Sequence, residues 1–344
     1  MTDPLIARLD PRIFGEIARH VLDTPVYEWI RSGSGPDFAG DNEAAFTRRR
    51  LRPRTLVDVS TIRTETTLLG AAVSAPVVVG PVGLQKAVHP DGELAMAAGA
   101  ARAGSLLVVA VNATTSIEDI AAAQPDLPLW FQLYNWDDRD ALAGVIGRAE
   151  AAGCKAIVPL VNTPIGVNHT SPRIGFRLPA GATFAHFETS PGLEAANTWE
   201  YLAWLRTVTS LPIVPKGIMT REDAARAVDA GVAGIIVSNH GGRQLARSIS
   251  TLDALPDVVA GAGGAEVYLD GGVRSGGDVL IALALGARAV LVARPVLWGM
   301  ALAGADGVAR VLDDLREGLA EDAGMCGIAD IATVPRDLVV DALG

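Results

Sequence analysis

One short stretch of the sequence carries a histidine and an arginine three residues apart, directly after an apolar run. The run from Ile235 ends at Ser238, and Asn239, His240, two glycines and Arg243 follow it. A neutral imidazole can take up a proton near pH 7, and a guanidinium can hold a carboxylate through paired hydrogen bonds. Together they suit removal of a proton from the carbon next to a carboxylate. We therefore predict that His240 is a base and Arg243 anchors an acid; the alternative for an isolated histidine is a structural role.

Two further segments combine small residues with an arginine at the end of an apolar run. They contain Asp270, Gly271, Gly272 and Arg274, and Ala293 and Arg294. Small residues let backbone N–H groups approach an anion, helix starts favour negative charge, and arginine binds phosphate in a bidentate manner. We therefore predict a phosphate site formed by both segments. The alternative is a tight turn with two surface arginines.

Lysine is rare in this chain, which holds only Lys86, Lys155 and Lys216 among its 29 basic residues. Lys216 ends the apolar, proline-containing run that begins at Leu211. A cation at a strand end can stabilise negative charge that develops on a bound group during reaction. We predict this role for Lys216, with simple pairing to a carboxylate as the alternative.

Short β-branched runs alternate with alanine-rich helical patterns along most of the chain. Because the apolar runs are continuous rather than alternating, we expect strands that are buried on both faces, as in a parallel sheet. The expected strands are 75–80, 105–111, 128–134, 156–161, 212–216, 234–239, 266–270 and 289–293. The expected helices are 91–103, 116–123, 137–152, 198–209, 220–230, 252–262 and 276–285, with Ser116, Asp137 and Thr220 as cap residues.

Eight strands with intervening helices predict an α/β fold, a (β/α)₈ TIM barrel with an N-terminal helical extension. The alternative is an open doubly wound sheet, but Gly80-Pro-Val-Gly83 lacks the spacing of a dinucleotide-binding loop. We expect residues 1–344 to form one domain. Residues 1–74 would supply short helices and a hairpin around 56–69 that closes the barrel bottom, 75–300 the barrel, and 301–344 C-terminal helices.

The bulk composition limits the partners and the location of the protein. The formal net charge of −10 argues against nucleic acid or an anionic membrane as a partner. The first residues show no signal peptide, no stretch reads as a membrane span, and the two cysteines, Cys154 and Cys326, have no metal-ligand spacing. We therefore predict a cytoplasmic protein with reduced cysteines and no metal site.

These motifs together resemble the FMN-dependent 2-hydroxy acid oxidases and dehydrogenases, a family that includes glycolate oxidase, lactate oxidase, mandelate dehydrogenase and the flavin domain of flavocytochrome b₂. The resemblance runs from about residue 13 to residue 331. The motifs that carry it are Ser238-Asn-His-Gly-Gly-Arg-Gln-Leu245, Phe131-Gln-Leu-Tyr134, Lys216-Gly217, Asp270-Gly-Gly-Val-Arg274 and Ala293-Arg-Pro295.

The resemblance implies FMN as cofactor and a role for each matching residue. His240 would be the base, Arg243 and Tyr134 would hold the substrate carboxylate and hydroxyl, and Lys216 would complete the catalytic set beside the flavin pyrimidine edge. Further cofactor contacts would come from Pro81, Val82, Gly83, Gln132 and Ser238, with Asp270, Gly271, Gly272, Arg274, Ala293 and Arg294 around the phosphate.

Three substrate-binding positions depart from the family pattern. Trp29 stands where the family has a tyrosine, and Asn162 stands where it has the aspartate that pairs with the base. His169, or its neighbour Asn168, falls near an expected arginine. The loop 176–199 is also shorter than is usual in the family, which would leave a more open pocket.

The resemblance implies oxidation of a 2-hydroxy acid to the 2-oxo acid, with oxygen, a quinone or a redox protein as electron acceptor and a homo-oligomer, such as a tetramer, as the assembly. Because the departures cluster around the substrate, a specialised biosynthetic oxidase of an unusual hydroxy acid, amino acid or acyl derivative is an alternative. A flavin-binding homologue with little turnover is less favoured, because Tyr134, Lys216, His240 and Arg243 are all retained. An FMN barrel of another chemistry is less favoured because of the Ser238–Leu245 segment, which we call the base motif.

Overall fold

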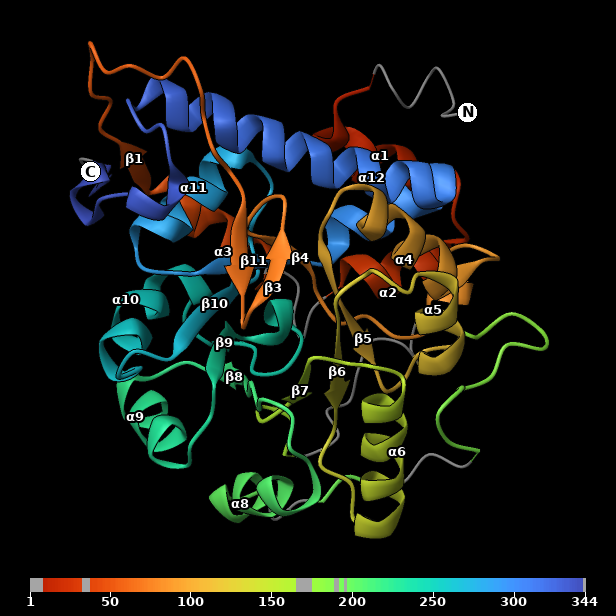
Figure 1. Cartoon of the computed structure of the whole chain (residues 1–344). Helices are drawn as coiled ribbons and strands as arrows, with labels where there is room; N and C mark the ends of the chain where they lie inside the picture. The colour runs from red at the N-terminus through yellow and green to blue at the C-terminus, as the bar shows by residue number, and fades with distance from the viewer. Residues whose placement is uncertain (1–8, 33–37, 165–174, 189–191, 195–196, 343–344) are drawn as a thin grey trace.

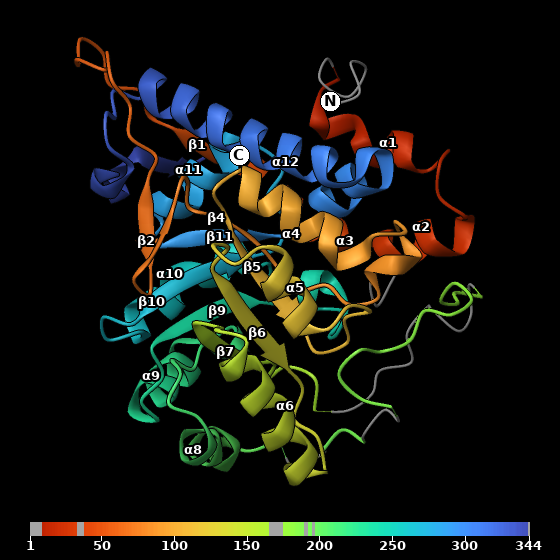
Figure 2. The ribbon, with the colours of Figure 1, turned by 45° about the vertical axis from the view of Figure 1, so that its right-hand side comes forward.

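The computed structural model describes residues 9–32, 38–164, 175–188, 192–194 and 197–342. Eight parallel strands form its centre, and helices surround them (Figures 1 and 2). In sheet order they are β7 (Ala156–Pro159), β6 (Leu129–Leu133), β5 (Leu106–Ala110), β4 (Val77–Val79), β11 (Ala289–Val292), β10 (Glu266–Asp270), β9 (Gly234–Ser238) and β8 (Lys216–Ile218).

The two edges of this sheet meet between β7 and the segment that leads into β8. Ile157 bridges Ile213, and Leu160 bridges Lys216. The N–H of Val214 donates to the carbonyl of Ile157 at 2.9 Å. The sheet therefore closes on itself, which confirms the predicted (β/α)₈ barrel.

One strand differs from its predicted bounds. The sequence predicts a strand over 212–216, whereas regular pairing of β8 with β9 begins at Lys216. Pro212 and Pro215 have no N–H to donate, so the residues before Lys216 contact β7 only through isolated bridges. A register shift follows within β8, where Gly217 has a φ of +118°. With this irregular backbone, the side chain of Lys216 lies inside the barrel near the carboxyl ends of the strands.

The helices of the barrel follow the strands closely. They are α4 (Gly92–Arg102), α5 (Ile117–Ala123), α6 (Arg139–Ala151), α8 (Trp199–Val208), α9 (Arg221–Asp229), α10 (Thr251–Gly261), α11 (Gly276–Ala284) and α12 (Arg294–Met325). Ser116 and Thr220 cap α5 and α9 as predicted. The cap of α6 was predicted one residue early, because Asp138 rather than Asp137 accepts from a first-turn N–H.

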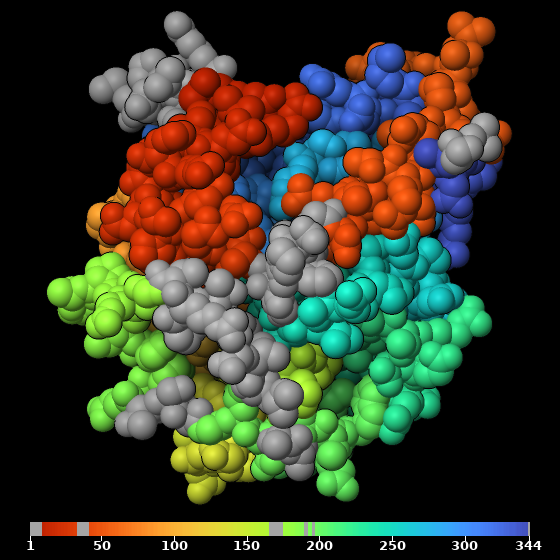
Figure 3. Space-filling view, turned by 180° about the vertical axis from the view of Figure 1, so that it is seen from behind, coloured from red at the N-terminus to blue at the C-terminus, as the bar shows by residue number. Residues whose placement is uncertain are grey.

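The N-terminal part packs over one side of the barrel, beside the last helix. It forms α1 (Phe14–Ala18), α2 (Thr24–Arg31) and α3 (Phe38–Thr47), and α1 lies against α12 (Figure 3). Helix α12 passes through residue 300 and is bent at Ala303 and Gly304, whose backbone angles are not helical. Strand β1 (Arg49–Leu51) then pairs antiparallel with β12 (Val339–Asp341), so the segment after α3 lies beside the last strand of the chain.

A short hairpin closes the end of the barrel at which the strands begin, but it lies later in the chain than the predicted range 56–69. The hairpin joins β2 (Thr66–Leu68) to β3 (Ala71–Val73), whereas residues 56–65 form no strand and Leu56 is fully exposed. Leu68 and Val73 pack into the barrel interior with Trp130 and Tyr268. The turn takes positive φ at Leu69 and Gly70. The predicted closure is therefore found, shifted along the chain.

Among the described residues, no helix is long and apolar enough to cross a membrane.

A buried histidine ties the long segment after β7 to the top of the barrel. The Nδ1 atom of His186 lies 2.9 Å from the carbonyl oxygen of Val111, and its Nε2 accepts from the N–H of Ile117 at 3.0 Å. The ring packs edge-on against Phe131, with 5.1 Å between ring centroids. Burial disfavours the charged imidazolium and lowers the pKa of His186.

We expect His186→Gln to weaken the acid sensitivity of the fold. The unfolded chain protonates this histidine below about pH 6.5 and the folded chain resists it, so the wild type loses stability as pH falls through that value. The variant should show a shallower loss between about pH 7.5 and pH 5.5 in urea denaturation. At pH 7.5 it should be about 1–3 kcal/mol less stable, because one amide replaces two matched hydrogen bonds poorly. Replacing the exposed His20 by glutamine is the control, and an identical slope in both variants would remove His186 from the effect.

Candidate functional site

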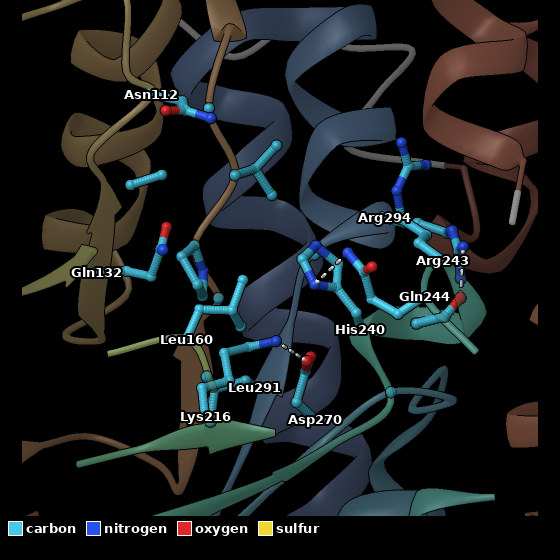
Figure 4. A pocket seen from close by; sticks show the side chains of 18 of the residues that line it. Asn112, Gln132, Leu160, Lys216, His240, Arg243, Gln244, Asp270, Leu291 and Arg294 are labelled. Carbon is cyan, nitrogen blue, oxygen red and sulfur yellow. Dashed lines mark hydrogen bonds and ion pairs between the residues drawn. The ribbon is translucent and has the colours of Figure 1, made fainter. Parts of the chain in front are cut away.

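The candidate site is a cavity of about 470 Å³ at the carboxyl ends of the strands. Residues that follow seven of the eight strands line it, together with Lys216 of β8 and two residues of α2 (Figure 4). The cavity brings together most of the residues predicted from sequence, namely Trp29, Pro81, Val82, Gly83, Gln132, Tyr134, Lys216, His240, Arg243, Asp270, Gly271, Gly272, Arg274, Ala293 and Arg294. In a TIM barrel this end is where active sites form.

A buried ion pair lies at the floor of the cavity. The Nζ atom of Lys216 is 2.5 Å from Oδ2 of Asp270, and it donates to Oγ of Ser238 at 2.8 Å. The hydroxyl of Ser238 in turn donates to Asp270 at 2.6 Å. All three side chains are buried, so the two charges depend on each other and on Ser238 for compensation. Lys216 pairs with a carboxylate, as the alternative interpretation expected, and it also lines the cavity, where its predicted role would place it.

His240 enters the cavity from a strained turn after β9. The 3₁₀ turn His240–Gly242 has positive φ at His240, at +60°, and at both glycines. A histidine in the left-handed region is uncommon, and such strain persists where surrounding contacts fix it. Here the N–H of His240 donates to Oγ of Ser238 at 3.0 Å. The ion-pair cluster therefore also fixes the backbone that carries the predicted base.

A pair of buried asparagines also holds this turn, and sequence analysis did not identify it. Asn42 of α3 and Asn239 exchange two hydrogen bonds, at 2.8 and 2.9 Å, and both side chains are buried. Asn239 also accepts from the N–H of Gly242 at 3.1 Å, and Asn42 accepts from the N–H of Thr251 at 3.1 Å. Only the fold brings residues 197 positions apart together, so no local pattern could have found Asn42.

The carboxyl end of α2 holds two arginines of the cavity. Nη1 of Arg243 donates to the carbonyls of Trp29 and Ser32 at 2.6 and 2.9 Å. Arg294 donates through Nε to the carbonyl of Ile30 at 3.1 Å and through Nη2 to that of Gly241 at 2.9 Å. Unpaired carbonyls and the negative end of the helix dipole favour cations at this position. Helix α2 thus orients both guanidiniums toward the cavity.

The arginine side of the cavity is strongly electropositive. Burial and the neighbouring guanidiniums of Arg274 and Arg243 lower the pKa of Arg294 to about 10. Burial also lowers the pKa of Arg243. Arg274 makes an ion pair with Glu43 of α3 at 2.7 Å. A bound anion would relieve the repulsion among these cations, which is what a phosphate site requires.

The opposite wall of the cavity is apolar and aromatic. It contains Ala110, Leu160, Trp136 and Leu193, with Tyr134 beside them. Burial raises the pKa of Tyr134, while the charge of Arg243 opposes the shift. The tyrosine therefore remains a neutral hydroxyl that can donate a hydrogen bond.

Trp29 lies at the rim between the two walls. Its ring stacks on Phe176 with 4.8 Å between centroids, and the guanidinium of Arg243 lies 5.9 Å from its ring centre. The loop expected over 176–199 is only partly among the described residues, and the predicted residues His169 and Asn168 lie outside them.

The remaining predicted residues lie behind the cavity wall. Ser238 is fully buried beneath it. The Nδ2 group of Asn162 donates to the carbonyl of Ser238 at 3.1 Å, and its Oδ1 has no hydrogen-bond partner among the described residues. Thr163, the next residue, does line the cavity. Gln244, which belongs to the base motif but was assigned no role from sequence, lines it as well.

The cavity fits the predicted FMN in its chemistry. The buried Nε2 group of Gln132 has no partner among the described residues, although it lies on the cavity wall and can donate to a ligand. Gly83 lies so close to Asn112 that a Cβ would approach the Asn112 carbonyl oxygen to 2.6 Å, so only glycine leaves the backbone this path. The arginines supply a phosphate site at one end, and Lys216 supplies a cation at the floor. A flat heteroaromatic ring with a phosphate tail matches this distribution of donors and charge.

The chain matches the model of the FMN-dependent dehydrogenase family over residues 18–341. It is 41% identical to human 2-hydroxyacid oxidase 2, with 94% of this chain and 95% of that protein covered. It is also 41% identical to L-lactate oxidase of Nostoc sp., with 89% and 91% covered. A solved structure of mandelate oxidase with benzoyl-formic acid superposes with a TM-score of 0.91, at 41% identity over 97% of this chain and 98% of that one.

Breaking the ion pair on one side should destabilise the protein far more than removing both charges. We expect Lys216→Met to cost about 3–5 kcal/mol, because it leaves the carboxylate of Asp270 buried without its cation. Lys216→Met combined with Asp270→Leu should recover most of that loss. Urea denaturation of the FMN-free protein measures both effects. Strictly additive free energies in this double-mutant cycle would contradict the coupling.

Proposed function

The chain belongs to the family of FMN-dependent dehydrogenases, and from this we propose that its cavity oxidises a 2-hydroxy acid to the 2-oxo acid with His240 as the base. It is an FMN-dependent oxidoreductase acting on CH–OH groups. The observation that carries the assignment of residues is that His240, Arg243 and Tyr134 line one cavity with Lys216 at its floor. A base, a carboxylate anchor, a hydroxyl ligand and a buried cation are the groups that this oxidation needs.

FMN would be held by residues from both ends of the cavity. Arg274 and Arg294, with the glycines at 271 and 272, would bind its phosphate, because backbone N–H groups and guanidiniums converge there. Lys216 would lie beside the part of the ring that gains negative charge, with Asp270 keeping the lysine in place. Gln132 would donate its unpaired amide N–H to the ring edge, while Pro81 and Val82 would pack beside it. When bound, FMN accepts the two electrons that leave the substrate.

The substrate would be oriented by its carboxylate and its hydroxyl. Arg243 is held through Nη1, so its Nε and Nη2 groups would be the donors to the substrate carboxylate. The neutral hydroxyl of Tyr134 would donate a hydrogen bond to the same substrate. The imidazole of His240 would then take the proton from the α-carbon. Trp29 would shield this end of the substrate from water by its stack with Phe176.

The side chain of the acid would be apolar and larger than that of glycolate. Ala110 and Leu160 at the strand ends and Trp136 beside them offer it van der Waals contact and no hydrogen bond from a charged group. The related mandelate oxidase acts on an aromatic hydroxy acid. The alternative, a specialised oxidase of an unusual acid, amino acid or acyl derivative, rests on Trp29 and Asn162 at substrate positions and on the size of the cavity.

A panel of acids tests the proposed substrate class. We expect the protein purified with FMN to be reduced under anaerobic conditions by 2-hydroxy acids with aryl or long alkyl side chains, more efficiently than by glycolate. Bleaching of the visible flavin band measures the rate constant for each acid. If every 2-hydroxy acid leaves the flavin oxidised while an amino acid or acyl derivative reduces it, the specialised alternative replaces the proposal.

The role of His240 is tested by its removal. We expect His240→Ala to lower the rate constant of flavin reduction by about 10²–10⁴-fold, because the α-proton then has no acceptor of suitable basicity. FMN content should stay unchanged, since the phosphate and ring contacts come from other residues. His89→Ala, which replaces a histidine outside the cavity, is the control. A reduction rate equal to that of the wild type would exclude His240 as the base.

A further inference from the structure

Trp136 lies between the cavity and a groove on the outside of the barrel. The groove has a volume of about 580 Å³, and the residues of α6 that line it include Ala141, Gly144 and Val145. Among the described residues, Trp136 is the one that lines both the cavity and the groove. Because Trp136 is only 3% exposed, it is packed between the two spaces and does not project into solvent.

Trp136 belongs to the row of side chains that includes Tyr134, the proposed ligand of the substrate hydroxyl. Side chains point alternately to the two sides of an extended chain. Gln132, Tyr134 and Trp136 are two residues apart, and all three line the cavity. An acid whose hydroxyl is bound by Tyr134 therefore meets Trp136 as the next residue along this side of the cavity.

The distribution of charge directs the side chain of the acid toward this wall. The arginines that would bind the phosphate and the carboxylate lie on the other side of the cavity. Around Trp136 the wall is apolar and includes Leu160 and Leu193. An apolar side chain gains most from burial there. Because FMN would occupy part of the cavity, the space left for this side chain ends at the apolar wall.

The backbone of Trp136 is fixed by the segment 192–194. Trp136 forms an antiparallel bridge with Leu193, and the N–H of Asp137 donates to the carbonyl of Gly192 at 3.1 Å. Residues on the two sides of the wall are thus joined by backbone pairing. The position of the tryptophan does not depend on side-chain packing alone.

The ring of Trp136 is held from the side of the groove by two phenylalanines. It packs edge-on against Phe187, with 5.3 Å between ring centroids, and Phe187 stacks on Phe184 at 4.7 Å. Between these two residues, His186 anchors the segment to the barrel through its two ring nitrogens. The ring is therefore a fixed wall, supported on the side away from the cavity.

The groove beyond this wall offers room for an apolar chain. Helix α6 lies beside β6 on the outside of the barrel (Figure 2). Its residue Gly144 is exposed, and a Cβ built there would meet no atom within 4 Å. Ala141 and Val145 present small apolar side chains on the same helix. Removing the indole of Trp136 would join the cavity to this groove.

We propose that Trp136 is a specificity-determining residue that sets the greatest length of the acid's side chain. The inference rests on the proposed function and narrows its substrate class. Aryl and medium alkyl side chains end at the indole, where they gain contact with it. Longer alkyl chains meet the indole before the carboxylate and the hydroxyl reach Arg243 and Tyr134, so these acids are poor substrates.

The length limit is measurable in the wild-type protein. We expect 2-hydroxyoctanoate to reduce the flavin about tenfold more efficiently than 2-hydroxydodecanoate under anaerobic conditions, because the longer chain does not fit in front of the wall. Efficiency is the limiting rate constant divided by the acid concentration at half-saturation. Equal efficiencies for the two acids would overturn the proposal.

Removing the indole should move this limit. We expect Trp136→Ala to raise the efficiency with 2-hydroxydodecanoate about tenfold, since the chain can then enter the groove, while lactate changes less than about threefold. Trp204→Ala is the matched control, because it removes a half-buried indole of α8 that lines neither space. Trp136→Leu keeps more of the packing and should show a smaller gain, which covers the case that the alanine variant does not fold.

Obstructing the groove separates a route for the chain from general loosening of the site. Gly144→Gln places a long polar side chain in the groove and favours the helix over glycine. Alone it should leave all efficiencies unchanged, since the wild-type cavity ends before the groove. Combined with Trp136→Ala, it should abolish the gain for 2-hydroxydodecanoate. A gain that persists in the double variant would contradict passage of the chain into the groove.

A binding measurement tests the wall without turnover. Titration of the FMN-bound protein with 2-oxododecanoate, followed by the change in the visible flavin spectrum, gives its dissociation constant. We expect this constant to fall about tenfold in Trp136→Ala and to return to the wild-type value when Gly144→Gln is added. An unchanged constant in Trp136→Ala would overturn the role of the tryptophan. A wild-type protein that no 2-hydroxy acid reduces would instead overturn the proposed function, and this titration would still test the wall.

Discussion

The buried ion pair between Lys216 and Asp270 is the constraint on which the candidate site depends. It joins the ends of β8 and β10 through the hydroxyl of Ser238 on β9, so three neighbouring strands are fixed relative to one another. The same hydroxyl accepts from the N–H of His240. One cluster thereby holds both the cation at the cavity floor and the backbone of His240, the proposed base. Loss of either charge would disturb both.

Helices α2 and α3 of the N-terminal segment hold site residues that the barrel loops supply. Arg243 and Arg294 come from the barrel loops, but the carbonyls at the end of α2 orient them. Asn42 of α3 supports the turn of the base motif through Asn239. A barrel alone would leave these groups on flexible loops, whereas packing of α2 and α3 over the strand ends gives them fixed partners. Helices α2 and α3 therefore contribute to the site largely through their backbone carbonyls and an amide side chain.

This division explains what the sequence predicts and what it does not. The barrel follows from continuous apolar runs, because burial on both faces of a strand leaves a clear pattern. The cavity residues follow from polar types at strand ends. The hydrophobic pattern does not predict the Leu69–Gly70 turn, because a leucine rarely adopts positive φ. It also does not predict that β8 begins at Lys216, because the pattern does not register the missing N–H groups of the preceding prolines. Asn42 was missed because its partner lies 197 residues away.

The cavity contains a cluster of arginines whose charges favour the binding of anions. Burial, together with repulsion from Arg274 and Arg243, lowers the pKa of Arg294 to about 10. Such a cluster costs stability in the absence of an anion and is relieved by one, so it favours the binding of negatively charged groups. An FMN phosphate and a substrate carboxylate are two such groups. In this setting the neutral amide of Gln244 beside His240 leaves the cluster positive, whereas a carboxylate would partly cancel the field that binds both anions.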